Sequence, residues 1–317
     1  MKTTKDASPL VSVILPVYNR EMFLAEAIES ILRQTYDRFE AIIADDGSTD
    51  NTAAIIRHYG RRDSRIRPFF LSHNGLPRTL NTAVSFSEGP ITAFMDSDDI
   101  AAPDRLEIQM QWMQEKKLDL CGSEVDVSGT AQDPLGGKDG IVRMPESHGA
   151  IIRELLFQIP LWRSALMLKT SVIRENPFDE NFGCTDCEWP YRIALRYTTG
   201  NVPRVLLNVR RHGGNITTLW RSPHRIVATK SRFNYFYQLF PRTPLPDYIA
   251  FARLADGDPM TSLWELERAG QWLVRFAAFP DDPLKERMRH RWAATCRRSI
   301  GLGDGVERLF KEYREKI

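Results

Sequence analysis

Residues 11–20 read VSVILPVYNR, a short β-branched run that ends in a proline and a polar loop. Such a run is typical of a buried strand, which we place at 11–15. The segment that follows has apolar residues at helical spacing, so we expect an amphipathic helix at 21–33. A second apolar run, FEAIIA at 39–44, predicts the next strand.

The same alternation continues to residue 122. We expect further strands at 66–71, 91–95 and 118–122, and further helices at 50–59, 76–87 and 103–116, with Gly60 ending the first of these helices and Pro103 opening the last. Strands that alternate with helices predict an α/β fold, with a Rossmann-like, mostly parallel sheet flanked by helices. Ligands of such sheets bind beyond the carboxyl ends of the strands, so the loops at 16–20, 45–50 and 96–99 are candidate binding loops.

The loop at 45–50 reads DDGSTD. A turn glycine and a helix cap account for Gly47 and for one of the polar residues after it. The adjacent carboxylates of Asp45 and Asp46 repel each other unless a partner collects them. A structural role and a binding role are equally well supported here.

The loop at 96–99 reads DSDD and directly follows the apolar run ITAFM. Three carboxylates in four residues repel one another, and a hard divalent cation such as Mn²⁺ or Mg²⁺ relieves that repulsion through oxygen ligands. The alternatives are a solvated acidic turn, or a helix cap formed by Asp99. The clustering favours a metal site.

Composition excludes several classes of protein. The hydrophobic content of 42% and the net charge of +2 are typical of a soluble globular protein and do not predict a nucleic-acid partner. The chain has no signal-peptide run and no 18-residue apolar stretch, so we expect a cytoplasmic protein, with contact to the inner face of the membrane left open. Four cysteines suit a reducing compartment, and the C-x-x-C of Cys184 and Cys187 lacks the second pair that a zinc site needs.

Glycine-rich phosphate loops are missing from the sequence, so a diphosphate would need a metal ion and basic side chains. Residues 210–215 read RRHGGN and offer cations and an imidazole for phosphate contact. A solvated basic turn is an equally good interpretation.

Taken together and in order, VSVILPVYNR, DDGSTDNT and ITAFMDSDD with PDRLE after it resemble the inverting family 2 glycosyltransferases, which have the GT-A fold. The resemblance covers residues from roughly 10 to 215. It implies a GT-A fold and a nucleotide-diphosphate sugar, UDP-linked above all, as the donor.

The resemblance implies a donor-binding set in the first half of the chain. The loop after the first strand would pack against the donor base, Asp46 would accept a hydrogen bond from a uracil ring, and Asp96 would contact ribose or metal. The residues implied on the donor side are Pro16, Val17, Tyr18, Asn19, Asp45, Asp46, Asn74, Gly75, Arg78, Asn81, Asp96 and Ser97.

The resemblance also implies the metal ligands, the base and the acceptor side. Asp98 would bind the metal with Asp96, and His212 would reach the metal or the diphosphate. Asp186 matches the catalytic base, and Thr185 stands where the family has a glutamate. The residues implied on the acceptor side are Trp162, Ser164, Glu188, Trp189 and Arg192.

The strand pattern stops after the resemblance ends. We expect a catalytic domain at 8–217, with a nucleotide-sugar half at 8–122 and an acceptor half at 123–217, and a helical region at 218–317 with helices at 261–279 and 283–299 broken at Pro280 and Pro283. Residues 285–298 carry six Lys or Arg against one Glu. This basic segment with Trp292 could lie on an anionic membrane or hold a lipid-diphosphate acceptor. A helix that simply packs on the catalytic domain is the alternative that we favour.

We therefore expect a metal-dependent inverting glycosyltransferase that moves a hexose or N-acetylhexosamine to a glycan or lipid-linked acceptor in surface polysaccharide synthesis. A cation would stabilise the departing diphosphate, and one carboxylate would take the proton of the acceptor hydroxyl. The alternatives are a non-catalytic nucleotide-sugar-binding module and a sugar nucleotidyltransferase. The nucleotidyltransferase would need a glycine-rich loop near the first strand, which VYNR does not provide.

Overall fold

The computed structural model describes residues 8–129, 139–181, 184–213, 221–277 and 282–316. Within these residues, nine strands form one sheet in the order β3-β2-β1-β4-β8-β6-β9-β5, and β7 pairs with β6. The described chain divides into two compact units, residues 1–148 with 161–231, and residues 149–160 with 232–317. The predicted boundary at 217/218 lies outside the described residues, and the structure divides the chain later, between Ser231 and Arg232.

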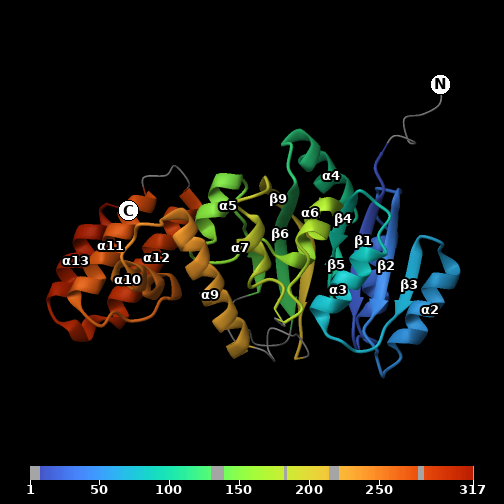
Figure 1. Ribbon diagram of the computed structural model, residues 1–317, viewed down its shortest axis with the longest axis horizontal. Helices are drawn as coiled ribbons and strands as arrows, with labels where there is room; N and C mark the ends of the chain where they lie inside the picture. Colours follow the sequence, from blue (N-terminus) through green and yellow to red (C-terminus); the bar gives the residue numbers. More distant parts are fainter. Residues whose placement is uncertain (1–7, 130–138, 182–183, 214–220, 278–281, 317) are drawn as a thin grey trace. The chain divides into compact units, whose positions relative to one another are not determined.

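The first half of the larger unit has the predicted parallel architecture. Its strands are β1 (Val11–Val17), β2 (Phe39–Asp45), β3 (Ile66–Phe70) and β4 (Ile91–Phe94), and its helices are α1 (Leu24–Leu32), α2 (Thr52–Arg62), α3 (Leu76–Ser85) and α4 (Arg105–Glu115). The strands pair in parallel in the order β3-β2-β1-β4 (Figure 1). Every residue of β1 and β2 is buried, as a strand covered on both faces requires.

Three local predictions differ from the structure. β1 continues through Pro16 and Val17, because both residues pair with β2. Gly60 lies inside α2 and does not end it; a Cβ there would lie 3.2 Å from Cγ of Pro68, so this glycine allows close packing on β3. α4 begins at Arg105, two residues after the expected start.

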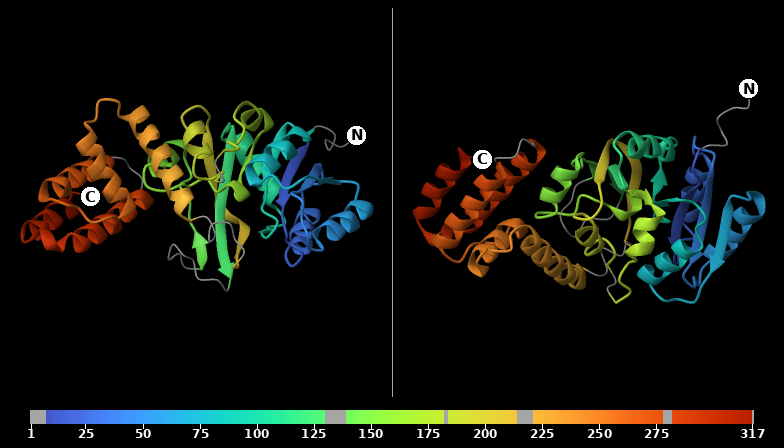
Figure 2. Two further views of the ribbon diagram at one scale, coloured as in Figure 1. Left: turned by 60° about the horizontal axis from the view of Figure 1, so that its bottom comes forward. Right: turned by 45° about the horizontal axis from the view of Figure 1, so that its top comes forward.

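The second half of the larger unit adds antiparallel pairs, so the complete sheet is mixed. Its strands are β5 (Ile100–Ala101), β6 (Leu120–Gly129), β7 (Gly140–Val142), β8 (Met167–Lys169) and β9 (Thr199–Arg211), and its short helices are η2 (Arg163–Ala165), α6 (Thr170–Glu175) and α7 (Trp189–Ile193). β8 runs antiparallel to β4 and β6, and β5 runs antiparallel to β9. Both views of Figure 2 show helices along the sheet. The predicted strand at 118–122 forms the start of β6.

The smaller unit is helical. It contains most of α5 (His148–Glu154), the end of α9 (Arg221–Leu239), and the helices α10 (Leu245–Asp256), α11 (Leu263–Ala277), α12 (Asp282–Arg298), η3 (Ile300–Leu302) and α13 (Gly305–Arg314). Aromatic rings form its core: Phe236, Phe251 and Trp272 contact one another, with centroids 4.9 to 5.9 Å apart. The end of the predicted helix at 261–279, together with Pro280, lies outside the described residues, and Pro283 lies in the first turn of α12.

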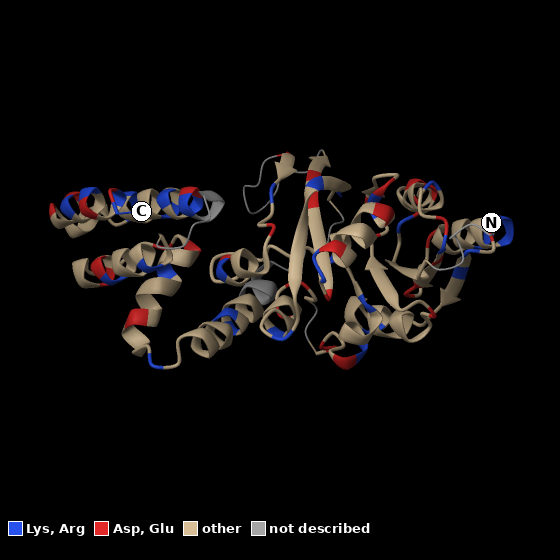
Figure 3. Ribbon diagram, turned by 90° about the horizontal axis from the view of Figure 1, so that it is seen from above, with Lys and Arg blue, Asp and Glu red and all other residues tan. Residues whose placement is uncertain are grey.

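The basic helix α12 does not present its tryptophan to solvent. Trp292 is fully buried, and its ring packs edge-on against Tyr313 at 5.7 Å. Arg287 of the same helix pairs with the buried Glu154 at 3.0 Å. Acidic and basic residues are interspersed along the ribbon near the C terminus (Figure 3). Trp292 is therefore a core residue of the smaller unit, and membrane contact through 283–299 stays a prediction. No helix in the described part of the chain has the length and apolar character that crossing a membrane requires.

Candidate functional site

The loops after β1 and β2 are joined by side-chain to backbone hydrogen bonds. Asn19 adopts a left-handed conformation, with φ 50°. Its Oδ1 accepts from the backbone N–H of Thr49 at 2.8 Å, and its own N–H donates to Oγ of Ser48 at 2.9 Å. Asn19 thus holds two of the three predicted binding loops together.

Asp45 and Asp46 are both buried, and both have backbone partners. Oδ1 of Asp45 accepts from the N–H of Ser48 at 3.0 Å. The two carboxylate oxygens of Asp46 accept from the N–H groups of Asn74 at 2.8 Å and Gly75 at 3.0 Å. These bonds explain why adjacent carboxylates are tolerated here. They also leave lone pairs on Asp46 that could accept from a ligand.

An exposed aromatic surface lies beside Asp46. The rings of Tyr18 and His73 stack with centroids 4.2 Å apart, and Tyr18 is 39% exposed. Nδ1 of His73 lies 2.9 Å from Oδ2 of Asp46. Gly47 makes this arrangement possible, because a Cβ there would lie 2.9 Å from the backbone N of His73. One flat ligand can therefore contact both Tyr18 and Asp46. His73, which lies between them, was not among the predicted donor-binding residues.

Other predicted donor residues have structural roles in this conformation. Val17 points its side chain into the hydrophobic core, and its carbonyl accepts from the N–H of Asp46. Pro16 is also buried within β1, so in this conformation both side chains lie inside the protein, and donor contact by this part of the loop stays a prediction. Arg78 pairs with Glu180 at 2.9 Å, and Asn81 bonds to the backbone of Phe178.

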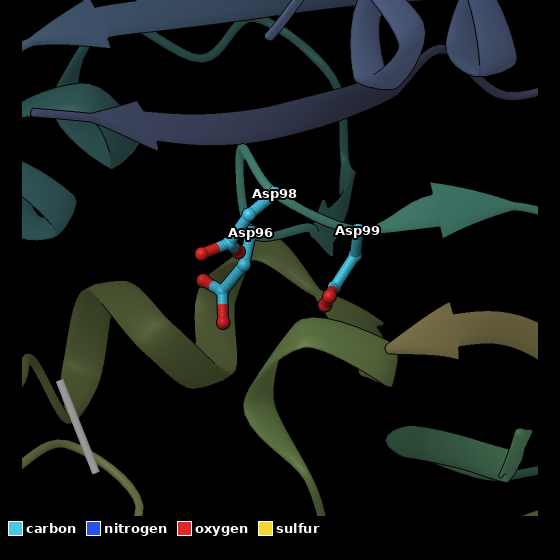
Figure 4. Close-up of side chains that lie close together, drawn as sticks. All are labelled: Asp96, Asp98 and Asp99. Atoms are coloured by element: carbon cyan, nitrogen blue, oxygen red, sulfur yellow. The ribbon is translucent and has the colours of Figure 1, made fainter. Parts of the chain in front are cut away.

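The acidic turn follows β4, at the carboxyl end of the parallel strands. Oxygen atoms of Asp96, Asp98 and Asp99 all lie within 4.8 Å of one another, and Ser97 is buried between them. Figure 4 shows the carboxylates of Asp96 and Asp98 side by side, with Asp99 farther along the loop. Hard divalent cations prefer such oxygen sets.

The three carboxyl groups are electrostatically unequal. Burial, and then the charges of Asp96 and Asp98, raise the pKa of Asp99 well above its usual range. Burial also raises the pKa of Asp96, against the opposing charge of Arg163. At Asp98 burial raises the pKa, but the hydrogen bond with His212 and the charge of Arg20 outweigh it and hold the pKa below its ordinary value. A divalent cation would relieve the repulsion that remains, so these residues fit a metal site.

Arginine and histidine side chains from three distant segments surround the turn. Nε of Arg20 lies 3.2 Å from Oδ2 of Asp98, and Nε2 of His212 lies 2.9 Å from the same oxygen. His212 stacks on Phe23 at 4.3 Å, which orients its ring. Nη2 of Arg163 donates to Asp96 at 2.5 Å. Both predicted metal carboxylates and the predicted histidine thus lie together.

Arg210 braces the same turn from β9. Its backbone N–H donates to Oδ1 of Asp99 at 3.2 Å, and its guanidinium donates to the carbonyls of Asp98 and Phe23 and to Glu26. These contacts hold the guanidinium against protein groups. In this conformation Arg210 supports the acidic turn, whereas the sequence left phosphate contact and a solvated basic turn equally open.

The candidate base lies near the turn. The side chain of Asp186 is 48% exposed, and its Oδ1 lies 3.6 Å from Nε of Arg163. The hydroxyl of Thr185 donates to the same oxygen at 3.3 Å. A half-exposed carboxylate with an arginine partner can accept a proton from a hydroxyl that approaches from solvent.

Cys184 and Cys187 form a disulfide that closes the turn carrying Asp186. The backbone N–H of Cys187 also donates to Sγ of Cys184. We expected the four cysteines to suit a reducing compartment, and this local cross-link differs from that expectation. Neither sulfur is available to a metal ion in this state.

The predicted acceptor side is only partly exposed. Ser164 is buried and donates a hydrogen bond to Asp99, and Trp162 packs against the hydrophobic core. Glu188 pairs with Arg192 at 2.6 Å. Trp189 is 1% exposed and its indole N–H donates to the carbonyl of Asn176, so in this conformation it packs inside the protein, and its acceptor contact stays a prediction.

Sequence reasoning missed Arg163 and Arg20 as members of the site. Arg163 is a charged residue among apolar neighbours in IPLWRSALML, and this was an available signal. Arg20 ends the quoted VYNR loop, but its partner Asp98 lies 78 positions away. No local pattern in the sequence indicates that pairing.

Comparison with known proteins agrees with this fold. The model of the family described as Glycosyl transferase family 2 matches residues 12–181, more than half of the chain. The chain therefore belongs to glycosyltransferase family 2. Asp186 and His212 lie beyond the matched residues.

Relatives in bacteria have similar names. An uncharacterized glycosyltransferase of Rickettsia felis is 33% identical over 212 residues, 65% of this chain and 34% of the relative. An uncharacterized glycosyltransferase of Haemophilus influenzae is 29% identical over 241 residues, 73% of this chain and 75% of the relative. The putative teichuronic acid biosynthesis glycosyltransferase TuaG of Bacillus subtilis is 36% identical over 140 residues, 44% of this chain and 54% of the relative. This chain spans about one third of the Rickettsia protein.

Solved structures share the fold at low sequence identity. Residues 1–349 of S. aureus TarS, crystallised with UDP-GlcNAc, have a TM-score of 0.55 and 17% identity, and the match covers 96% of this chain and 87% of that TarS fragment. The mannosyltransferase PcManGT from Pyrobaculum calidifontis, in complex with GDP-Man and Mn²⁺, has a TM-score of 0.55 and 20% identity over 97% of this chain and 85% of that one. The chain has the expected GT-A fold with additional C-terminal helices.

Proposed function

We propose that this protein is a metal-dependent inverting glycosyltransferase that moves a hexose or N-acetylhexosamine from a UDP-sugar to a glycan or lipid-linked acceptor. The observation that carries the proposal is the cluster of Asp96, Asp98 and Asp99 with the half-exposed Asp186 nearby. The three clustered carboxylates suit a metal ion that binds a diphosphate. The carboxylate of Asp186 suits a base that accepts the proton of a hydroxyl. TuaG is named for teichuronic acid biosynthesis, which supports a role in surface polysaccharide synthesis.

The metal ion would be held by Asp96 and Asp98, with His212 at its edge. A bound Mn²⁺ or Mg²⁺ would supply positive charge where the diphosphate leaves. Asp99 is buried behind the other two carboxyl groups and bonded to Ser164 and the backbone of Arg210, so we assign it a supporting role.

The donor base would lie on Tyr18, with Asp46 accepting from its edge. Tyr18 offers an exposed ring, and both oxygens of Asp46 are held in place by the backbone of Asn74 and Gly75. A uracil stacked on the ring would present its N–H to such a fixed carboxylate. TarS with UDP-GlcNAc and PcManGT with GDP-Man support a nucleotide-sugar donor as a class.

Asp186 would accept the proton of the acceptor hydroxyl as the new glycosidic bond forms. Attack from the side opposite the leaving diphosphate inverts the anomeric centre. The described site supplies one base and no second carboxylate assigned as a nucleophile, which favours direct displacement over a covalent intermediate.

A thermal-shift panel of UDP-glucose, UDP-N-acetylglucosamine and GDP-mannose, with and without Mn²⁺, tests the proposal first. Donor binding stabilises the folded state by mass action, so at least one UDP-sugar with Mn²⁺ should raise the Tm. Hydrolysis of that donor should then require Mn²⁺ and fall at least about 100-fold in Asp186→Asn, while the thermal shift persists. A chain that binds the donor but neither hydrolyses nor transfers it is a binding module, and a chain that binds none of the panel contradicts the proposal.

A further inference from the structure

Arg163 joins the two parts of the candidate site. It lies in η2, and 6% of its side chain is exposed. Its Nη2 donates to Oδ1 of Asp96 at 2.5 Å. Its Nε donates to Oγ1 of Thr185 at 3.1 Å and lies 3.6 Å from Oδ1 of Asp186. One planar group therefore contacts the acidic turn and the turn of the candidate base, although these turns are about 90 positions apart in the sequence.

The fold alone does not explain an arginine at this position. Nη1 of Arg163 is buried and has no hydrogen-bond partner among the described residues. An unsatisfied buried donor costs about 1–3 kcal/mol, and more when the group is charged. Leu161 and Ala165, two positions away on either side in the sequence, are buried and apolar. A polar group retained at such a cost points to a role in the site.

The geometry of the guanidinium group allows Arg163 to orient two partners at once. The group is rigid and planar, so a hydrogen bond to Asp96 through Nη2 fixes the direction of Nε. Thr185 receives that Nε–H and donates its own hydroxyl proton to Asp186 at 3.3 Å. Arg163 and Thr185 thus connect Asp96 to Asp186 by hydrogen bonds and orient the carboxylate of Asp186.

We propose that Arg163 is a positioning residue that, with Thr185, holds the carboxylate of Asp186 at a fixed place relative to Asp96. The inference rests on the proposed function, because it concerns the alignment of the base with the donor side of the same site. Thr185 stands where the resembling family has a glutamate. In this chain the threonine hydroxyl accepts from Arg163 and donates to Asp186. It therefore links the arginine to the base without the additional negative charge of a glutamate.

Two substitutions separate alignment from charge. Arg163→Lys keeps a cation beside Asp96, but an ammonium cannot reproduce the planar contact to both turns. Thr185→Val keeps the size of the side chain and removes the hydroxyl link. The probe is Mn²⁺-dependent hydrolysis of whichever UDP-sugar in the panel stabilises the wild type most. A misaligned base lowers the rate by up to about 100-fold, so we expect kcat to fall at least about tenfold in Arg163→Lys and about threefold or more in Thr185→Val.

Donor affinity should remain, because neither substitution removes a predicted donor contact. We expect the donor KM to change less than about threefold in both variants, and Thr185→Ser to restore kcat. Arg204→Lys, which alters an exposed arginine paired with Asp104, is the matched control and should keep both constants. If Arg163→Lys keeps the wild-type kcat, charge alone suffices and the inference is wrong.

Folding and function are separable in this design. Thermal melting shows whether each variant is folded. If Arg163→Lys does not fold, the comparison of kcat in Thr185→Val and Thr185→Ser tests the inference. Equal kcat values in these two variants would overturn it. An inactive wild type would instead remove the proposed function, and the inference with it. An active wild type with unaffected variants would remove the inference alone.

Discussion

Nε2 of His212 lies 2.9 Å from Oδ2 of Asp98, although 114 positions separate the two residues. The pairing of β5 with β9 explains this contact, since Ile100 lies opposite Asn208 in an antiparallel register. The acidic turn precedes β5 and His212 follows β9, so the register brings the turn and the imidazole to the same edge. The sheet therefore assembles the candidate metal site from two distant segments.

Asp98→Asn should weaken metal binding and sugar transfer together. The substitution keeps the size of the side chain but removes the charge that His212 and Arg20 surround. We expect the Mn²⁺ concentration for half-maximal activity to rise at least about tenfold. Mn²⁺ titration of donor hydrolysis measures this. Asp104→Asn, at a partly exposed residue paired with Arg204, is the control. An unchanged Mn²⁺ dependence in Asp98→Asn would contradict the assignment.

Glu40 should make folding sensitive to acid. It is buried in β2, and although burial raises its pKa, hydrogen bonds from Ser12, the backbone of Glu88 and Arg67 outweigh burial and hold the pKa below its ordinary value of 4.5. A depressed pKa contributes stability that is present above the unfolded value and is lost as the pH falls through the folded value.

Glu40→Gln should accordingly lower the free energy of unfolding by about 1–3 kcal/mol at pH 7. The difference from the wild type should shrink as the pH falls below 4.5, which is the ordinary pKa. Urea unfolding at several pH values measures both effects. Glu115→Gln, at an exposed position, should change stability little at any pH. A constant difference across the pH range would show that ionisation of Glu40 is irrelevant to folding.

The disulfide between Cys184 and Cys187 predicts a thiol count. Cys121 and Cys296 are free and buried, so the denatured, non-reduced protein should show two reactive thiols, and four after reduction. The loop is short, so reduction should lower stability by at most about 2 kcal/mol. Four thiols without reductant would show that the cross-link does not form in the purified protein.

Trp292 should contribute to stability. It is fully buried in α12 against Tyr313, so Trp292→Ala should lower the free energy of unfolding by about 3–5 kcal/mol. Trp264→Ala provides a matched control in the same unit, because Trp264 is 45% exposed. Chemical denaturation measures both variants. Equal, small losses in the two variants would mean that Trp292 is not part of the core.

Much of the nucleotide half could be predicted from sequence because its signals are local. The β-branched run at 11–15 and the helical spacing at 21–33 concern neighbouring residues, and the structure places β1 and α1 there. The repulsion among Asp96, Asp98 and Asp99 is also local, and the structure finds their oxygens together. The second half of the larger unit was harder to predict, since antiparallel partners such as β4 and β8 are far apart in sequence.

The same distinction applies to single side chains. Trp189 and Trp292 stand in polar or basic segments, and only packing decided that both are buried. The sequence did not indicate a disulfide between Cys184 and Cys187, and the turn between them brought the sulfurs together.

The sequence by itself determined the alternation of strands and helices, the acidic turn and the family. The tertiary structure alone decided which cations surround that turn, and that Arg163 connects it to Asp186. The physical reason is that residue type and spacing control local conformation and repulsion between neighbours. Which distant charges meet depends on strand register and on the burial of each side chain, and these exist only in the folded sheet.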